Sequence, residues 1–580
     1  MTVEWSLDAE LARRPRVRVN QLGYLPDGPK RAVLVTDATA PVRFEVRDEL
    51  DGGVHVGDST PWPVRPDPSS GLGVHLIDFG AVTATGEGYR VAADGAASHP
   101  FTIRSDLYRP LAVDALRFFT LQRSGIAIDD SVAPGYGRPA GHVGVPPNRG
   151  DIAVRAWTGP DAERLYPGWR CAGEFDVSGG WYDAGDHGKY VVNAGLSVAQ
   201  LLSAREHARR SGPRHLPSSI EDALLAECRW ELDWMVRMQV PAGTPLAGTA
   251  FHRVHGTEWP PLPMWPHEDP TERVLHRPST AATLNLAAAA AHGARVFTDV
   301  DTVYSARLLD AARVAYRAAI EHPMLFAPDD NGAFGGGPYS DGELDDEFYW
   351  AAVEMFLATD EQAFLDDLQR SPCHHADVFE PDGFDWDRVA VNARLDLATI
   401  GSRLTDRTRV QQSVVGGADR IIEIQRAQPW SQPYAPDDGW DWGSNGRILN
   451  NLVVLATAYD LTSQREYLDA TLAGVDFLFG LNALGQSFVT GYGTDHTCHQ
   501  RTRHFAHDLD PTFPPPPPGA IAGGPNSKTY PGFPSDDRLQ GLPPQLCYLD
   551  EPTSETTNDV CIRWNAPLVW VAMFLAQHSG

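Results

Sequence analysis

STAATLNLAAAAAHGARVF (residues 279–297) shows the pattern that decides the fold. Its apolar residues recur at intervals of three and four, which is the period of an α-helix. The same period returns in about a dozen segments after residue 107, among them VDALRFFTLQR, SIEDALLAECRWELDWMVRMQ and VYSARLLDAARVAYRAAIEH. A dozen helices paired as hairpins fit an α/α barrel better than a compact bundle. The sequence therefore predicts a mainly α fold for residues 106–580.

The beginning of the chain has a different texture. Residues 16–104 hold short Val-rich runs such as RVRVNQLGY, KRAVLVTD and VRFEVRD, separated by turn clusters such as DELDGG and RPDPSSG. Several short strands at this spacing predict a small β-sandwich. We therefore expect an N-terminal extension over residues 1–15, a sandwich over residues 16–105 and the helical domain after it.

Composition narrows the class of protein. The chain has 580 residues, 42% of them hydrophobic and 21% charged, which is a globular composition suited to two or more domains. The formal net charge of −28 argues against nucleic acid or an anionic membrane surface as the main partner, because both attract basic patches. No apolar run reaches the ~18 residues that a membrane span needs.

Two features bear on the compartment. The start, MTVEWSLDAELARRPRVRVNQ, shows no apolar core of a secretory signal. The six cysteines form no C-x-x-C pair, which favours free thiols in a reducing environment. We expect a cytoplasmic protein, or a secreted one if a leader has been trimmed away.

A glycine-rich stretch, VSGGWYDAGDHGKYV (residues 177–191), carries Asp183 and Asp186 three residues apart. One interpretation is a surface turn, where Asp and Gly are the usual residues. The other is a site where glycines let the backbone approach a ligand and the carboxylates do acid–base chemistry. The stretch alone leaves both open.

Two later segments also carry candidate side chains. GQSFVTGYGTDHTCHQRTRH (residues 485–504) gathers basic residues without the Cys/His spacing of a zinc site, so it fits either recognition of hydroxyls or a solvated loop. CYLDEPTSETTNDVCIRWNAPLVWVAMFL (residues 547–575) leads Asp550, Glu555 and Asp559 into an apolar helix that Thr557 or Asn558 could cap. Acids are favoured at a helix start, and that alone would account for them.

Together, seven stretches in order resemble the family 9 glycoside hydrolases, which are cellulases and related β-glucan-cleaving enzymes. They are DVSGGWYDAGDHGKYV, HRPSTAATLNLAA, DDEFYWAA, WGSNGRILNNLVVLATAYD, FGLNALGQSFVTGYG, GAIAGGPNS and DVCIRWNAPLVW. VRVNQLGYLP resembles the immunoglobulin-like domain that often precedes the barrel in that family. The resemblance spans nearly the whole chain and implies an (α/α)6 barrel that hydrolyses its substrate with inversion.

The resemblance also implies catalytic roles. Asp183 and Asp186 match the family's aspartate pair, which holds and activates water, with Asp186 as the main base. The family's general acid is the Glu of an Asn-Glu-Val string. Residues 558–560 read Asn-Asp-Val, so Asp559 holds that register with one methylene less. Glu555 lies four residues earlier and would share a helix face with Asp559, so it stays open as the alternative acid, as does weak activity.

Substrate contacts are implied in the same way. His499 and Arg501 match a His-x-Arg pair that contacts the sugar beside the cleaved bond. Trp564 matches an aromatic in the same subsite. Trp386 and Trp442 are candidate stacking platforms, although packing in the core would account for each tryptophan equally well.

Metals are the last implication. Members bind calcium beside the string that matches SDGELDDEF, where Asp346 and Glu347 offer hard oxygen ligands. An acidic helix start would account for the same two residues. Some members hold a structural zinc with Cys and His, but Ser124 and Gly141 stand at the cysteine positions and leave only His142. We therefore expect no zinc there.

The leading hypothesis is a monomeric, inverting hydrolase of β-1,4-glucans or cello-oligosaccharides. An exo-acting β-glucosidase or β-glucosaminidase on the same fold is the first alternative. It would be favoured if the proline-rich loop around residues 514–518 blocks one end of the cleft. A carbohydrate-binding protein with impaired catalysis is the second, and its only support is the missing Glu at position 559. Chain-length preference and endo or exo mode stay open.

Overall fold

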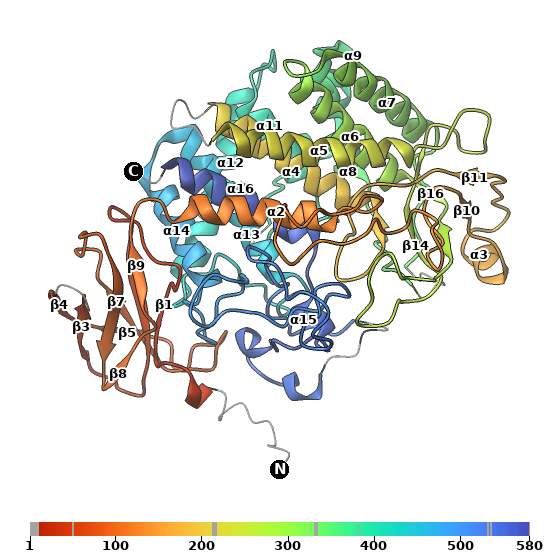
Figure 1. Ribbon diagram of the computed structural model, residues 1–580. Helices are drawn as coiled ribbons and strands as arrows, with labels where there is room; N and C mark the ends of the chain where they lie inside the picture. The colour runs from red at the N-terminus through yellow and green to blue at the C-terminus, as the bar shows by residue number, and fades with distance from the viewer. Residues whose placement is uncertain are drawn as a thin grey trace.

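The computed structural model describes residues 11–48, 52–210, 217–329, 335–380, 382–530, 533 and 536–578. A small β-sandwich stands beside a larger helical domain (Figure 1). Most of the expected extension over residues 1–15 lies outside the described residues. Within the described part, no helix is both long enough and apolar enough to cross a bilayer.

Two antiparallel sheets form the sandwich. One sheet has the order β1 (Val17–Val19), β2 (Arg31–Val35), β6 (Val74–Asp78) and β5 (Thr60–Pro61). The other has the order β4 (Val54–Asp58), β3 (Arg43–Arg47), β7 (Gly86–Ala93) and β8 (Ala96–Ala97), with β9 (Phe101–Ile103) also paired to β7. Alternate side chains such as Phe44 and Val46 of β3 point inward and meet Ile77 of β6 in a common core.

The sandwich is joined to the helical domain through the NQLGY string. Buried Asn20 donates a 2.7 Å hydrogen bond to Asp476, and the Gln21 side chain donates to the carbonyl of Gly485 at 2.8 Å. Burial raises the pKa of Asp476 to about 8, partly offset by the Asn20 hydrogen bond. Polar groups therefore hold the two domains in register at this junction.

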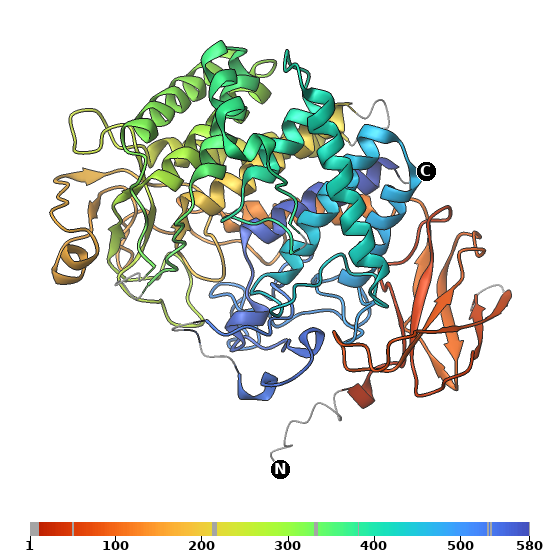
Figure 2. The ribbon, with the colours of Figure 1, turned by 180° about the vertical axis from the view of Figure 1, so that it is seen from behind.

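Twelve helices of nine or more residues among the described residues form an (α/α)6 barrel, as predicted (Figures 1 and 2). The inner ring closes in the order α4 (Val191–Arg210), α6 (Thr280–Phe297), α8 (Asp345–Thr359), α11 (Ala390–Thr399), α13 (Ser444–Thr462) and α16 (Ile562–His578), which contacts α4 again. The outer helices are α2 (Tyr108–Gln122), α5 (Ser218–Arg237), α7 (Thr302–Glu321), α9 (Gln362–Arg370), α12 (Arg407–Arg426) and α14 (Arg465–Leu478).

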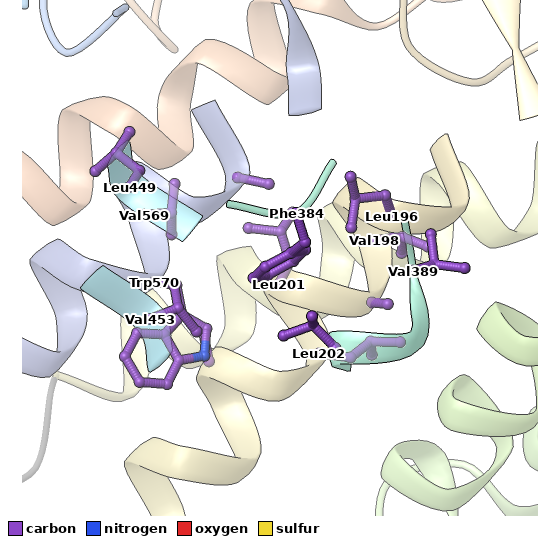
Figure 3. Close-up of a cluster of buried hydrophobic side chains, with 14 of the residues drawn as sticks. Leu196, Val198, Leu201, Leu202, Phe384, Val389, Leu449, Val453, Val569 and Trp570 are labelled. Carbon is purple, nitrogen blue, oxygen red and sulfur yellow. The ribbon is translucent and has the colours of Figure 1, made fainter. Parts of the chain in front are cut away.

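The inner helices are buried around almost their whole circumference. In α6 every residue except Arg295 is buried, and its run of alanines lets neighbouring helices approach closely. Ser279 caps this helix by accepting a hydrogen bond from the backbone of Ala282. Figure 3 shows the packing at the barrel centre, where leucines and valines of α4, α13 and α16 meet Phe384.

Loops at one end of the barrel carry the remaining elements. A mixed sheet has the order β11 (Glu174–Phe175), β10 (Val154–Ala156), β15 (Arg273–Leu275), β14 (Arg253–Gly256) and β12 (Lys189–Tyr190). β13 (Ala250–Phe251) pairs with β16 (Pro278–Ser279), and the short helices are α3 (Pro160–Leu165), α10 (Pro372–His375) and α15 (Glu555–Asn558). Two single 3-10 turns, η1 (Asp537–Leu539) and η2 (Pro544–Leu546), lie in the loop before α15. The Ile562 amide at the start of α16 donates to the Asp183 carbonyl at 2.8 Å, so the loops that lead into α4 and α16 meet at this end.

Candidate active site

The glycine-rich loop is a buried structure, which excludes the surface-turn interpretation. Asp183 is 1% exposed and Asp186 is 6% exposed. The amide of Asp183 donates to the carbonyl of Gly188, and the amide of Gly188 donates to the Asp186 carboxylate at 2.8 Å. A Cβ at Gly188 would lie 2.7 Å from an Asp186 oxygen, so only glycine allows this approach.

The Asp183 carboxylate is the more heavily bonded of the pair. Asn193, in the first turn of α4, donates to both of its oxygens at 2.9 and 3.0 Å, and the Tyr339 hydroxyl donates at 3.1 Å. Burial, reinforced by the charge of Asp186, raises the pKa of Asp183 to about 7. The charge of Asp186 therefore helps to keep Asp183 protonated. Asn193 and Tyr339 were missed by sequence reasoning.

Tyr339 has an unusual backbone for a bulky residue. Its φ of 45° lies in the left-handed region, a sign of strain that is common at functional sites. Its ring lies 4.8 Å from the ring of Tyr190 and 5.3 Å from that of Trp386. The strained backbone thus places one hydroxyl on Asp183 and one ring against two aromatic neighbours.

Asp559 lies next to this loop. Its carboxylate accepts hydrogen bonds from the amides of Gly185 at 3.2 Å and Val560 at 2.9 Å. A Cβ at Gly185 would lie 2.1 Å from the Arg501 carbonyl oxygen, so there is no room for a side chain at position 185. Burial, Glu555 and Asp186, in that order, raise the pKa of Asp559 well above its usual value. A carboxylic acid kept protonated beside an aspartate pair can act as a proton donor.

The helical relation expected between Glu555 and Asp559 is wrong. The short helix α15 ends at Asn558, Asp559 is extended with φ −68° and ψ 164°, and α16 begins only at Ile562. Thr557 and Asn558 therefore do not cap the apolar helix. Glu555 lies 3.5 Å from Arg501, and its charge still acts on Asp559.

The His-x-Arg segment runs alongside the acid. The Arg501 amide donates to the Asn558 carbonyl at 2.9 Å, and Arg501 and Asp559 form a parallel bridge. Asp550 anchors both segments, because it accepts hydrogen bonds from the His499 amide and the Asn558 side chain. The His499 ring contacts Asp508 near the surface. Arg501 thus lies at the candidate site, and His499 lies at its margin.

The three candidate tryptophans differ in exposure. Trp564 is 2% exposed and packs against Gly443 and Gly446, where any side chain would clash with the indole. Trp564 therefore packs against the start of α13, and its contact with a sugar stays a prediction. Trp386 and Trp442 are partly exposed; Trp386 contacts Tyr339, and Trp442 packs on the ring of Tyr530 at 5.7 Å. Both remain candidate platforms.

Four carboxylates gather beside α8, more than the two predicted; Glu347 is buried and the other three are partly buried. Oxygens of Asp341, Glu347 and Asp387 are buried without a hydrogen-bond partner among the described residues, and Asp346 accepts from the Val389 amide at 2.7 Å. Burial and the neighbouring acids raise the pKa of Glu347 well above its usual value and that of Asp341 to about 6. Arg447 lies 4.0 Å from Asp387 and compensates only part of this negative charge, so the oxygen donor set suits a hard cation such as calcium. The string SDGELDDEF could have suggested Asp341, but nothing in it points to Asp387.

The position expected to lack zinc is filled by protein atoms. The Tyr182 hydroxyl lies 2.7 Å from His142 Nδ1, and a Cβ at Gly141 would stand 2.5 Å from that hydroxyl. His142 also lies near Asp269, which pairs with His187 at 2.9 Å. Burial lowers the pKa of His142 to about 3. His142, His187 and Asp269 bring ligand atoms within 4.8 Å of one another, but they include no thiolate, unlike the Cys and His ligands that the resemblance implies; the absence of zinc stays a prediction.

Comparison with known proteins agrees with this geometry. The family model of glycosyl hydrolase family 9 matches residues 108–572, and that of the cellulase N-terminal ig-like domain matches residues 12–98. The chain is 50% identical to Endoglucanase C of Cellulomonas fimi over 98% of its length, but spans only 52% of that relative. It is 38% identical to Cellulose 1,4-beta-cellobiosidase of Acetivibrio thermocellus, covering 97% of this chain and 67% of the relative. A metagenome-derived glycoside hydrolase family 9 endoglucanase of known structure superposes with a TM-score of 0.82 at 29% identity, covering 98% of this chain and 100% of the other. The chain therefore belongs to glycosyl hydrolase family 9.

Proposed function

We propose that this protein hydrolyses β-1,4-glucosidic bonds of cellulose-type glucans with inversion. The observation that carries the proposal is the hydrogen bond from Gly185, inside the aspartate loop, to the carboxylate of Asp559. It brings the aspartate pair and a protonated carboxylic acid to one end of the barrel. The names of the two relatives, an endoglucanase and a cellobiosidase, support the same substrate class.

Each carboxyl group has one task in this reaction. Asp186 takes a proton from a water molecule as the water oxygen attacks the anomeric carbon. Asp183, held by Asn193 and Tyr339, orients that water and shares the charge of the pair. Asp559 gives its proton to the glycosidic oxygen as the bond to the anomeric carbon breaks. We assign the base to Asp186 because its carboxylate accepts one hydrogen bond, from Gly188, and so has oxygen lone pairs free for the water, whereas Asp183 accepts three hydrogen bonds.

Cleavage of cellopentaose, followed by NMR of the fresh products and by chromatography, tests this function. We expect the new reducing end to appear first as the α-anomer, because single displacement inverts the β-bond. First products of several different lengths would indicate endo cleavage. Cellobiose with cellotriose as the only first products would indicate a cellobiosidase, and glucose with cellotetraose would indicate the β-glucosidase alternative. Retention of the β-anomer, or binding without cleavage, would contradict the proposal.

We also propose that calcium bound by Asp341, Asp346, Glu347 and Asp387 stabilises the barrel. Bound calcium would neutralise carboxylates that are otherwise buried against one another, and it would fix the segment that follows Tyr339. A chelator should lower the melting temperature reversibly, and excess calcium should restore it. Glu347→Gln should remove this response, whereas Glu343→Gln, at an exposed position of the same segment, should keep it. Loss of activity at an unchanged melting temperature would show that the ion has another role.

A further inference from the structure

A second polar and aromatic pocket lies at the far edge of the mixed sheet. One cavity of ≈310 Å³ has Trp157 and Trp169 in its wall, and an adjoining cavity of ≈820 Å³ extends over β10 and β15. The two cavities share Trp157, Thr158 and Cys171, and we call them together the Trp157 pocket. Both volumes lie within or at the edge of the range of ~300–1,000 Å³ that is usual for ligand sites.

Both indoles are held rigidly on one tyrosine. The ring of Tyr166 lies 6.3 Å from Trp157 and 5.9 Å from Trp169, nearly perpendicular to each. Trp157 also lies on His276 at 4.9 Å, and its amide donates to the Leu275 carbonyl at 2.8 Å. Each indole stays partly exposed. Aromatic faces fixed in this way contact a ligand at little cost in entropy.

Four of the charged residues around the pocket form two ion pairs, and Arg273 pairs with buried Asp151. Arg155 and Glu174 form a 2.8 Å ion pair, and Arg170 pairs with Glu163. Compensated charges attract neither an anion nor a cation strongly, but they offer donors and acceptors to hydroxyl groups. Aromatic walls with a polar, charge-balanced rim therefore suit a neutral polyhydroxylated ligand such as a sugar.

The pocket connects with the candidate active site through the mixed sheet. β12 directly follows the aspartate loop, and β10 lies three strands away, roughly 14 Å at the usual strand spacing. Thr257 lines the larger cavity, and Trp259, two residues further on, lies 5.6 Å from the guanidinium of Arg503. Arg503 donates to the Gly185 carbonyl between the two aspartates at 3.2 Å. A few glucosyl units would span this path.

We propose that the Trp157 pocket is a distal binding site for the glucan chain that is cleaved at the aspartate loop. This inference rests on the proposed function. It means that a long chain is held at two places, with sugar rings stacked on Trp157 and Trp169 well away from the bond that breaks. Short substrates would not reach the pocket, so it raises affinity for long chains alone.

The kinetic test compares long and short substrates. The double variant Trp157→Ala/Trp169→Ala should raise KM for cellohexaose about tenfold, as expected when an aromatic anchor is lost. It should leave kcat and KM for an aryl cellobioside unchanged. Trp62→Ala in the sandwich is the matched control and should change neither. Unchanged melting temperatures would show that the variants are folded.

Alkylation of Cys171 tests the pocket without any substitution in the pocket itself. Cys171 is partly exposed in the shared wall, and partly exposed Cys373 on α10 is an internal reference. Cellohexaose should slow alkylation of Cys171 several-fold in the Asp186→Asn variant and leave Cys373 unaffected. A bulky maleimide on Cys171 should in turn raise KM for cellohexaose in the wild type.

The outcomes separate this inference from the proposed function. If cellohexaose is cleaved but neither the tryptophan variant nor the label changes its KM, and Cys171 is unprotected, the distal site is refuted while the hydrolase stands. If no glucan is cleaved by the wild type, the proposed function fails, and protection of Cys171 alone decides the pocket. Protection would then support a sugar site, and its absence would overturn it.

Discussion

Asp186→Asn is expected to lower kcat on cello-oligosaccharides by roughly 10²–10⁴-fold, with KM little changed. The amide cannot take a proton from the attacking water, but it can still accept the hydrogen bond from the Gly188 amide that fixes the side chain. The loop should therefore keep its shape. Initial rates on cellopentaose, together with the melting temperature, measure both quantities.

Two controls sharpen this result. Asp176→Asn changes an exposed aspartate at the start of the same loop and should leave kcat unchanged. Asp183→Asn should also impair turnover, but it disturbs the hydrogen bonds from Asn193 and Tyr339, so its KM should change as well. Turnover near that of the wild type in Asp186→Asn would remove Asp186 from the role of base.

Local patterns in the sequence predicted the barrel and the aspartate pair. The inner helices carry the helical period over long segments, and Asp183 and Asp186 stand among glycines that pack without room for a Cβ. Both signals depend on neighbours along the chain. These local patterns match the folded structure because each helical hairpin of the barrel packs against the next one along the chain.

Contacts between distant segments were not predictable in this way. Tyr339 reaches Asp183 across 156 positions, and nothing in its local string marks it as a donor to that carboxylate. Asp387 joins the acids of α8 from another loop. The burial of the Trp564 side chain was also not predictable, because it depends on Gly443 and Gly446, which pack on the indole from the start of α13. Glu555 and Asp559 do not share the helix face that was expected, because α15 ends one residue before Asp559.

The second large effect is expected from substitution of Asp559, the proposed proton donor. Asp559→Asn should lower kcat on cellopentaose by roughly 10²–10⁴-fold, because the leaving sugar oxygen needs a proton as the bond breaks. An activated aryl cellobioside, whose leaving group needs little protonation, should keep most of its rate. The ratio of the two rates, measured on one preparation, isolates the proton donor from any general damage to the fold.

The dependence of activity on pH tests the role of Asp559 independently. Asp559 must be protonated to act, and its pKa is raised by burial and by the charges of Glu555 and Asp186. Activity on cellopentaose should therefore fall as pH rises through the pKa of Asp559. The aryl cellobioside, whose leaving group needs little protonation, should show a much weaker alkaline fall than cellopentaose.

Glu555→Gln is the matched variant that decides between the two acids. Removing the charge of Glu555 should lower the pKa of Asp559, so the alkaline fall should move to lower pH while the maximal rate changes little. The opposite pattern, with Glu555→Gln inactive on cellopentaose and Asp559→Asn active, would assign the proton donor to Glu555. Because burial raises the pKa of Asp559 well above its usual value and its carboxylate lies against the aspartate loop, we expect Asp559 to keep the role.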